Sequence, residues 1–522
     1  MSRPHASAPP GQGGAPPGPG LTRRRAFRAA LGAAGAAAAG SALAGCGTSF
    51  ERLAAAASRP AVLTWQPWYG FPTAEVNATA PVQQQQRQLQ QLMQEAIQAW
   101  AATEGVQVQV LPPATSSTTT VASMLAGTGP DVFWDVNLPL FAQQGLVLDL
   151  QPYVVRDQID VTVYTQAQMD YIGAAGAGQP GGAALFALPA TVEVLAIGLY
   201  QGALDALGLT YPEPDWTAAQ WAGLWASASV RAQGQAGGQL AWGGYDSWGA
   251  NPSPFYLKGF GGEYVDPADP ARCGLDQAAS QAALQWCYGQ ILAGTCLGSS
   301  RSVVQPMILG QVVSGPLGTS GELYDAARNW SSTLGKWDLY AMPAWPQGRL
   351  TGASSDFYAV WSGTRSPDLA WALVRYLCVG TDWQSLMMQM ALAGPNQKAL
   401  WHAWAELARQ YASPLAHKNL NAYLDAVAGD QLYVGLPFRY NEQQVAGVLG
   451  SFGAEVLSGR ATVPAAAQQS ATQIDGIEAA GAAAEAAAAA ALRKLGGSPP
   501  SSSSAGASGP APAGSGPPGA SG

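Results

Sequence analysis

Patterns typical of strands and helices alternate along residues 61–135, and this order constrains the fold more than any other feature of the sequence. The apolar run AVLTWQPWY at 61–69 is typical of a buried strand and breaks at Pro67. Residues 83–102 carry apolar side chains at helical spacing, and residues 106–110 alternate valine with glutamine as a strand does. Because strands separated by helices usually pair in parallel, we predict an α/β sheet flanked by helices.

The alternation continues well beyond this region. A helix pattern at 116–127 begins with capping hydroxyls and precedes a second short buried strand at 129–135. Pro189 interrupts the long apolar run at 184–200, so we predict a strand that crosses from one lobe to another rather than a helix. Residues 366–379 predict a helix with proline in its first turn.

Tryptophan and glycine dominate the middle of the chain. Residues 215–229 predict a helix with Asp215 as its N-cap and with Trp221 and Trp225 on one face. The following segment, 242–264, is rich in glycine and aromatic residues, a composition that favours loops rather than core.

The end of the chain is simpler in composition. Residues 442–474 predict a helix, a turn and a second helix, and the alanine-rich residues 481–495 favour a further helix. Residues 1–20 and 496–522 contain few large side chains, so we expect both tails to stay disordered.

Residues 21–46 have the order of an export signal, with arginines, an apolar run and small residues that end at Cys46. The run is too short and too rich in alanine and glycine for a membrane span. Residues 43–46, LAGC, resemble the bacterial lipobox, which implies that residues 1–45 are removed, Cys46 is acylated, and residues 46–58 form a tether. Arg24-Arg25-Ala26-Phe27 is similar to a twin-arginine core, although an ordinary basic segment would contain the same residues.

Composition excludes several classes of function. A formal net charge of −8, with 11% charged residues, lacks the basic footprint of a nucleic-acid-binding protein. With 3 histidines and no phosphate-binding or nucleophile motif, we expect no metal site and no cofactor. Outside the cell Cys273, Cys287 and Cys296 could form a disulfide, or these residues and Cys378 could be small buried side chains.

The order of segments from about residue 60 to residue 478 resembles the family 1 extracellular solute-binding proteins of ABC importers, which include the maltose-binding proteins. The segments that carry the resemblance are AGTGPDVFW with AQQGLVLDL (126–150), LPATVEVLAIGLYQGALDALGL with DWT (188–217), MILGQVVSGPLGTS (307–320), WDLYAMPAWPQGR (337–349), GASSDFYAVWSGTRSPDLAWALVRYL (352–377) and VLSGRATVPAA (456–466).

The resemblance implies an α/β, two-lobed periplasmic-binding-protein fold of type II, in which each lobe is a mainly parallel sheet flanked by helices and a hinge joins the lobes. Residues 59–191 and 359–396 would form lobe 1, and residues 192–358 and 397–480 would form lobe 2. The protein would be a monomer, anchored by lipid on the outer face of the cytoplasmic membrane, that binds a carbohydrate between its lobes and passes it to an ABC permease.

The same resemblance places Trp134, Asp135 and Glu193 at the ligand. An indole ring packs on the C–H face of a sugar, and carboxylates accept hydrogen bonds from its hydroxyls. Asp131 is expected to be structural, and Leu317 stands where maltodextrin-binding members have a tryptophan, which puts maltose itself in doubt. The other expected ligand-binding residues are Trp65, Trp68, Tyr69, Tyr245, Trp248, Asp356, Tyr358 and Tyr440.

Other readings of the sequence stay open. The solute could be a glycerol-phosphate, a polyol or a small peptide, although a phosphate would favour convergent arginine or lysine. A secreted glycosidase would need two carboxylates, for which Asp135 and Glu193 are the candidates. A signalling or adhesion lipoprotein that has lost transport is a further alternative.

Overall fold

The computed structural model describes residues 61–67, 81–113, 116–135, 137–176, 184–233, 240–246, 252–266, 268–269, 271–298, 305–319, 322–323, 326–330, 335–391, 394–411, 413–435, 438 and 442–494. The predictions for Cys46, Trp68, Tyr69, Trp248 and Tyr440 lie outside these residues. None of the described helices combines the length and the apolar content that crossing a membrane requires.

The first strands and helices form as predicted. Strand β1 (Ala61–Gln66) ends just before Pro67 and pairs in parallel with β2 (Val106–Val110) and β3 (Val132–Asp135). Helix α3 (Pro81–Thr103) connects β1 to β2, and α4 (Ser117–Leu125) connects β2 to β3. The Ser116 side chain caps α4 by accepting a hydrogen bond from the Thr119 N–H, as its hydroxyl-rich start predicted.

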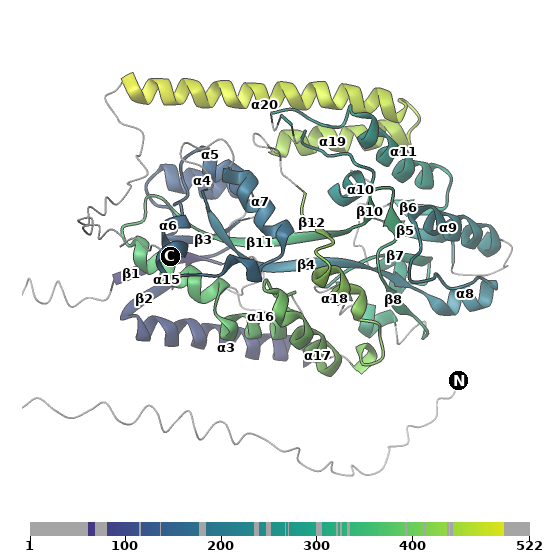
Figure 1. Cartoon of the computed structure of the whole chain (residues 1–522), viewed down its shortest axis with the longest axis horizontal. Coiled ribbons are helices and arrows are strands. Elements are labelled where there is room, and N and C mark those ends of the chain that lie inside the picture. The colour runs from purple at the N-terminus through teal and green to yellow at the C-terminus, as the bar shows by residue number, and fades with distance from the viewer. Residues whose placement is uncertain are drawn as a thin grey trace, which may run out of the picture. The chain divides into compact units, whose positions relative to one another are not determined.

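One sheet joins most of the strands, in the order β2-β1-β3-β11-β4-β7-β5-β6. At one end of the sheet β2, β1 and β3 pair in parallel, and at the other end β7, β5 and β6 do so. In the middle, β11 pairs antiparallel with both β4 and β3. Figure 1 shows β4 and β11 side by side between α3 and α16 on one side and α4, α5 and α7 on the other. The other strands are β4 (Ala187–Leu199), β5 (Trp242–Asp246), β6 (Cys296–Gly298), β7 (Val312–Gly318), β8 (Asp338–Tyr340), β9 (Ala344–Trp345), β10 (Gly348–Arg349), β11 (Thr351–Val360) and β12 (Leu432–Tyr433).

Helices cover both faces of this sheet. They include α5 (Leu138–Gln143), α6 (Gln151–Arg156), α7 (Gln166–Gly176), α8 (Gln201–Leu207), α9 (Ala218–Gln233), α10 (Pro254–Gly259), α11 (Ala278–Leu292), α12 (Gln305–Ile308), α15 (Pro367–Cys378), α16 (Thr381–Ala391), α17 (Trp401–Tyr411), α18 (Asn421–Ala428), α19 (Glu442–Leu457) and α20 (Val463–Lys494).

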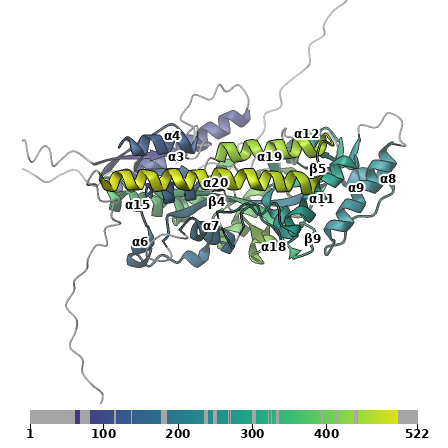
Figure 2. The same ribbon diagram turned by 90° about the horizontal axis from the view of Figure 1, so that it is seen from above.

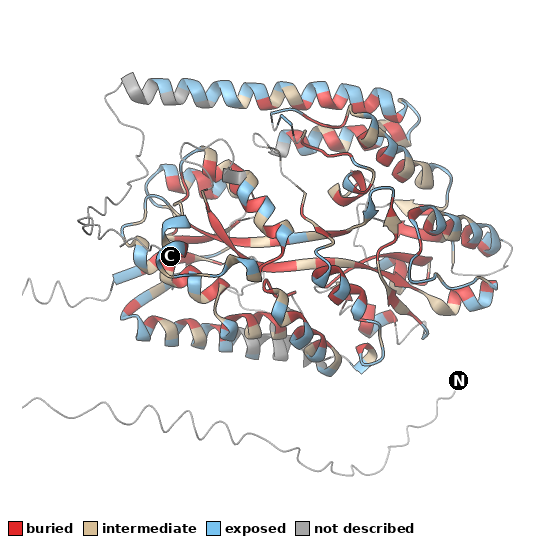
Figure 3. Cartoon of the chain, viewed as in Figure 1, coloured by how far each residue is buried: buried red, intermediate tan, exposed pale blue. Residues whose placement is uncertain are grey.

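Strand β4 passes from one hydrophobic core to another. Leu188 and Ala190 pack in the core around β1, β3 and β11, whereas Val192 and Val194 pack in the core around β7 and α18. Figure 3 shows that β4 and β11 are buried over most of their length. The chain therefore changes core beside Thr191, as expected of a crossing strand.

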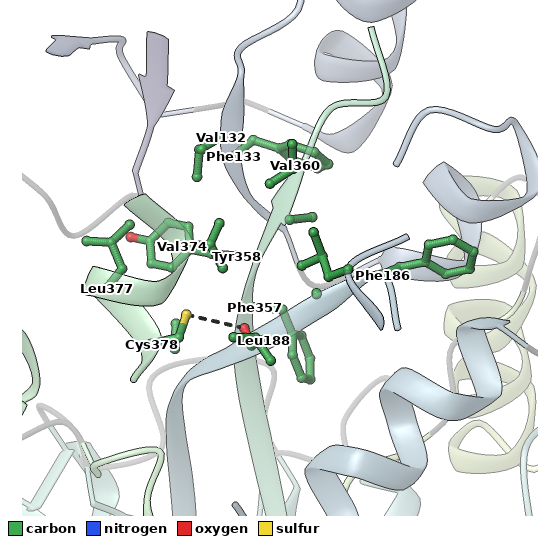
Figure 4. Close-up of a cluster of buried hydrophobic side chains, with 14 of the residues drawn as sticks. Val132, Phe133, Phe186, Leu188, Phe357, Tyr358, Val360, Val374, Leu377 and Cys378 are labelled. Atoms are coloured by element: carbon green, nitrogen blue, oxygen red, sulfur yellow. Dashed lines mark hydrogen bonds between the residues drawn. The ribbon is translucent and has the colours of Figure 1, made fainter. Parts of the chain in front are cut away.

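The core around β11 also holds a cysteine. Figure 4 shows the Cys378 thiol directed at the carbonyl oxygen of Leu188, to which it donates a hydrogen bond at 3.6 Å. Cys273, Cys287, Cys296 and Cys378 are all buried, and none of the four forms a disulfide with another. Of the two predicted alternatives, the structure therefore shows small buried side chains, and burial raises the pKa of Cys273 to about 12.

Helix α9 begins later than its sequence predicted. Asp215 is not the N-cap, because the helix starts at Ala218 and Thr217 takes that role. The Gln220 N–H donates to Thr217 Oγ1 at 3.3 Å, and Gln220 Oε1 accepts from the Thr217 N–H at 2.7 Å. This reciprocal pair is a capping box, which the Thr-x-x-Gln spacing could have revealed.

The prediction of loops at 242–264 is wrong. Residues of this segment form β5 and α10, and the side chains of Tyr245, Phe255 and Tyr256 are buried. Two of the glycines serve packing: a Cβ atom on Gly243 would lie 2.1 Å from the Trp225 carbonyl oxygen, and one on Gly244 would lie 2.1 Å from the Trp225 ring. Glycine and tryptophan therefore fit together across β5 and α9.

Helices α19 and α20 pack side by side (Figure 2). Their buried side chains share a core with α11. The alanine-rich stretch predicted as a separate helix continues α20 without a break to Lys494, and its described side chains beyond Ala479 are mostly exposed.

Candidate functional site

Three strands bring the predicted polar and aromatic residues together. Trp134 on β3 lies opposite Tyr358 on β11, and Asp356 on β11 lies opposite Thr191 on β4. Ser354 then lies opposite Glu193 in the same ladder. Because residues two apart on a strand share a face, Thr191 and Glu193 point to one side of β4. We call Trp134, Thr191, Glu193, Ser354 and Asp356 the strand-junction cluster.

Asp356 is the electrostatic centre of this cluster. Its Oδ2 atom accepts a 2.6 Å hydrogen bond from the Thr191 hydroxyl. The pKa of Asp356 is raised to about 6, mainly by burial and to a smaller extent by the charge of Glu193, although hydrogen bonds from Thr191 and Trp134 oppose the increase. Asp356 therefore changes charge near neutral pH.

Glu193 lies against a glycine of the neighbouring strand β7. A Cβ atom on Gly318 would come within 2.1 Å of Glu193 Oε1, so a larger residue here would displace this carboxylate from its present position. The Gly318 N–H donates to Glu322 Oε2 at 3.0 Å, which brings a second carboxylate to the same place. Burial raises the pKa of Tyr423 well above its ordinary value, and the charges of Glu322 and Glu193 add to the increase. The Tyr423 hydroxyl donates to the Leu317 carbonyl oxygen. Leu317 itself is fully buried, so it offers no stacking surface.

Other predicted residues lie in the cores. Trp65 is 0% exposed and packs against Trp383 and Tyr358, with ring centroids 5.7 and 6.1 Å away. Tyr358 is 3% exposed in the same core, and Tyr245 is 0% exposed in the core around β7. Packing accounts for the positions of these three aromatic side chains.

The two aspartates of the GPDVFWD segment hold local structure. Asp131 accepts hydrogen bonds from the Thr64 N–H and hydroxyl, both at 2.7 Å, and from the Thr364 hydroxyl at 2.5 Å, which confirms its structural role. Asp135 is 3% exposed and accepts from the Asn137 N–H at 2.6 Å and from the Ser117 hydroxyl at 3.1 Å. These bonds explain the orientation of Asp135 without a ligand.

Sequence reasoning missed Thr191, Ser354, Gly318 and Glu322. Thr191 could have been found, because it precedes Glu193 by two residues on a predicted strand and so shares its face. Ser354, Gly318 and Glu322 come from other segments, and only the strand register and the β7 contact bring them to this place.

The strand-junction cluster can bind hydroxyl groups. Carboxylates accept hydrogen bonds, serine and threonine hydroxyls both donate and accept, and a half-buried indole offers an apolar face. Among the described residues, no group of three or more histidine, cysteine, aspartate or glutamate side chains is placed to hold a metal ion.

Solved structures with the same fold are known. A sugar transporter protein from Rhizobium etli aligns with a TM-score of 0.61 and 16% identity over 80% of this chain and 99% of its own. The sugar-binding protein MalE from Xanthomonas citri aligns with a TM-score of 0.61 and 16% identity over 80% of this chain and 97% of its own. The cyclic alpha-maltosyl-1,6-maltose binding protein from Arthrobacter globiformis aligns with a TM-score of 0.59 and 16% identity over 80% of this chain and 99% of its own. These similarities confirm the predicted α/β fold.

Sequence comparison gives the family directly. No curated protein matches this chain. The model of the bacterial extracellular solute-binding proteins matches residues 82–378, more than half of the sequence, as the order of segments predicted. The chain therefore belongs to the family of bacterial extracellular solute-binding proteins.

Proposed function

We propose that this protein captures a neutral sugar or short oligosaccharide at the strand-junction cluster and delivers it unchanged to an ABC permease. The single observation that carries the proposal is the convergence of the Trp134 indole with the Asp356 and Glu193 carboxylates where β4 changes core. An indole face beside hydroxyl acceptors is the arrangement that a sugar ring requires. The sugar ligands named for the structurally similar proteins support the same class.

The charge of the cluster argues against an anionic solute. Asp356, Glu193 and Glu322 bring carboxylates to this part of the sheet, and these would repel a phosphate. A glycerol-phosphate would instead need convergent guanidinium or ammonium groups. A neutral polyhydroxy ligand therefore suits the cluster best.

A thermal-shift screen tests the proposal. The full chain would be heated with glucose, maltose, trehalose or longer oligosaccharides, each well above its dissociation constant. A ligand at a hundred times its dissociation constant stabilises the folded state by about 2.7 kcal/mol. We expect at least one sugar to raise the melting temperature and inorganic phosphate to have no effect.

Variants of Trp134 locate the binding. Trp134→Ala should abolish the shift without unfolding the protein, because this side chain is half-buried. Trp134→Phe keeps an aromatic face and should retain much of the shift. If both variants behave like the wild type, Trp134 is not at the site.

The absence of catalysis is part of this proposal. Asp135, one of the two carboxylates considered for a glycosidase, is buried and held by Asn137 and Ser117, which does not suit a proton donor at a glycosidic bond. Chromogenic glycosides should stay intact during incubation with the protein. Turnover that is lost in Glu193→Gln would instead support an enzyme.

We place the protein on the outer face of the cytoplasmic membrane, held as a monomer by acyl chains on Cys46. The sequence LAGC at 43–46 supports this placement, since two or more acyl chains anchor a protein stably. In cells, the wild type should fractionate with membranes and carry a lipid mass on its N-terminal peptide. Cys46→Ser should appear in the soluble fraction.

A further inference from the structure

A cavity of about 370 Å³ is lined by none of the residues of the strand-junction cluster. Three segments line it: the 212–216 stretch after α8, the residues around β8 and β10, and helix α18 with the turn that follows it. Its volume falls within the range of about 300–1,000 Å³ that is typical of small-molecule sites. Nothing in the proposed function uses this space.

The half-buried Tyr340 gives the cavity an aromatic surface. Trp216 is only 2% exposed and packs against Tyr340 edge to face, with ring centroids 6.4 Å apart. The Trp216 N–H donates to the Ala341 carbonyl oxygen at 2.9 Å, which fixes the ring. The apolar surface is therefore preformed and does not need a ligand to order it.

Polar groups surround the opening. In the described part of the chain, no hydrogen bond or ion pair engages the carboxylates of Glu213 and Asp425, which are both on exposed residues. Arg349 donates one hydrogen bond, to the Pro214 carbonyl oxygen at 2.7 Å, and keeps other N–H groups available. The Gln431 amide adds a donor and an acceptor.

The charged and aromatic groups around the cavity together favour a neutral ligand that carries hydroxyl groups. Two carboxylates against one guanidinium disfavour an anion, and the charged rim disfavours an oily molecule. A sugar satisfies all the groups at once, because its hydroxyls donate to carboxylates and accept from Arg349 while its C–H face packs on the Tyr340 ring. We propose that the cavity is a second carbohydrate site, with room for about one or two sugar rings.

The site has contacts that lead towards the strand-junction cluster. Helix α18 lines the cavity through Asp425 and Ala426, and its Tyr423 hydroxyl reaches the Leu317 carbonyl oxygen beside Gly318. Thr351 of the cavity lies three residues before Ser354 on β11. The two sites are nevertheless lined by different side chains, so each can be removed without the other.

The experiment uses the full chain with Trp134→Ala, in which the proposed transport site is disabled. Glucose and maltose at millimolar concentration should still give saturation-transfer NMR signals from the sugar protons. Adding Glu213→Gln and Asp425→Asn should weaken this binding about tenfold or more, the effect of losing about 1.4 kcal/mol. Asp382→Asn, an exposed carboxylate on α16, is the matched control and should change nothing.

The outcomes separate this proposal from the transport function. Binding that survives Trp134→Ala but falls in the Glu213 and Asp425 variant supports the second site. Absence of any sugar signal in the Trp134→Ala protein overturns it, whatever the wild type binds. Equal binding in the cavity variant and in the Asp382 control also overturns it.

Discussion

The Thr191 hydroxyl donates a 2.6 Å hydrogen bond to Asp356 Oδ2 across the paired strands β4 and β11. This bond lies where the side chains of β4 change from one core to the other. It stabilises the ionised carboxylate, but burial acts more strongly and leaves the pKa of Asp356 at about 6, above its ordinary value of 3.8. Folding therefore favours the protonated form of this group.

This raised pKa makes stability depend on pH in a definite direction. Between about pH 4 and pH 6 the folded protein holds a proton on Asp356 that the unfolded chain has lost, so the free energy of unfolding falls as pH rises. The contribution is about 3 kcal/mol, since a pKa difference of one corresponds to about 1.4 kcal/mol. Denaturant unfolding across this range should show the free energy of unfolding of the wild type fall relative to that of Asp356→Asn, which does not titrate at this position, and the change should level off above pH 6.

A second variant tests whether the pKa of Asp356 is the cause of this pH dependence. Thr191→Val removes the hydrogen bond that lowers the pKa of Asp356, so the pH window should move upward. A difference between wild type and Asp356→Asn that stays constant from pH 4 to pH 7 would show that Asp356 titrates as in the unfolded chain.

Gly318 controls the position of Glu193. A methyl group at this position would come within 2.1 Å of Glu193 Oε1, which is the mobile end of a side chain and can move away. We expect Gly318→Ala to fold normally but to weaken sugar binding about tenfold, because the displaced carboxylate loses its alignment. Calorimetric titration measures the loss. Gly450→Ala, which has open space on α19, should bind like the wild type.

The sequence predicted individual elements better than the distribution of aromatic residues. The strand before Pro67, the Ser116 cap and the crossing strand at 184–200 were all predictable, because local period and capping chemistry determine them. The capping box at Thr217 was visible in the same way, but Asp215 matched the N-cap preference equally well.

The site was only partly predictable. The family resemblance indicated Trp134, Glu193 and Asp356, and the strand register brings them together. Nothing in a single sequence separates a tryptophan at a strand end that faces a ligand from one that packs in a core, and Trp65 is the second kind. The role of Gly318 depends on a contact between β4 and β7, which no local pattern encodes.

The same reasoning predicts the cost of filling the space beside Trp225. A Cβ atom on Gly244 would lie 2.1 Å from the Trp225 ring, which is buried and cannot move away. We expect Gly244→Ala to destabilise the protein by about 1–3 kcal/mol or more. Gly223→Ala on α9, with no atom within 4 Å, should instead stabilise it by about 0.5–1 kcal/mol. If both variants shift the denaturation midpoint equally, close packing at Gly244 is not the cause.

Ser314 on β7 provides one acceptor for two buried tryptophans. Its hydroxyl oxygen accepts the indole N–H of Trp225 at 2.8 Å and of Trp221 at 3.1 Å. Ser314→Ala removes the hydroxyl that accepts from the Trp221 N–H in a fully buried place, and an unsatisfied buried donor costs about 1–3 kcal/mol. Denaturant unfolding should show this loss, together with a change in near-ultraviolet circular dichroism from the two indoles.

Ser451→Ala is the control, because it removes an exposed hydroxyl that bonds to its own helix. The stability of this variant should stay within about 0.5 kcal/mol of the wild type. A loss of similar size in both variants would mean that the shared hydrogen bond does not hold the tryptophan pair in place.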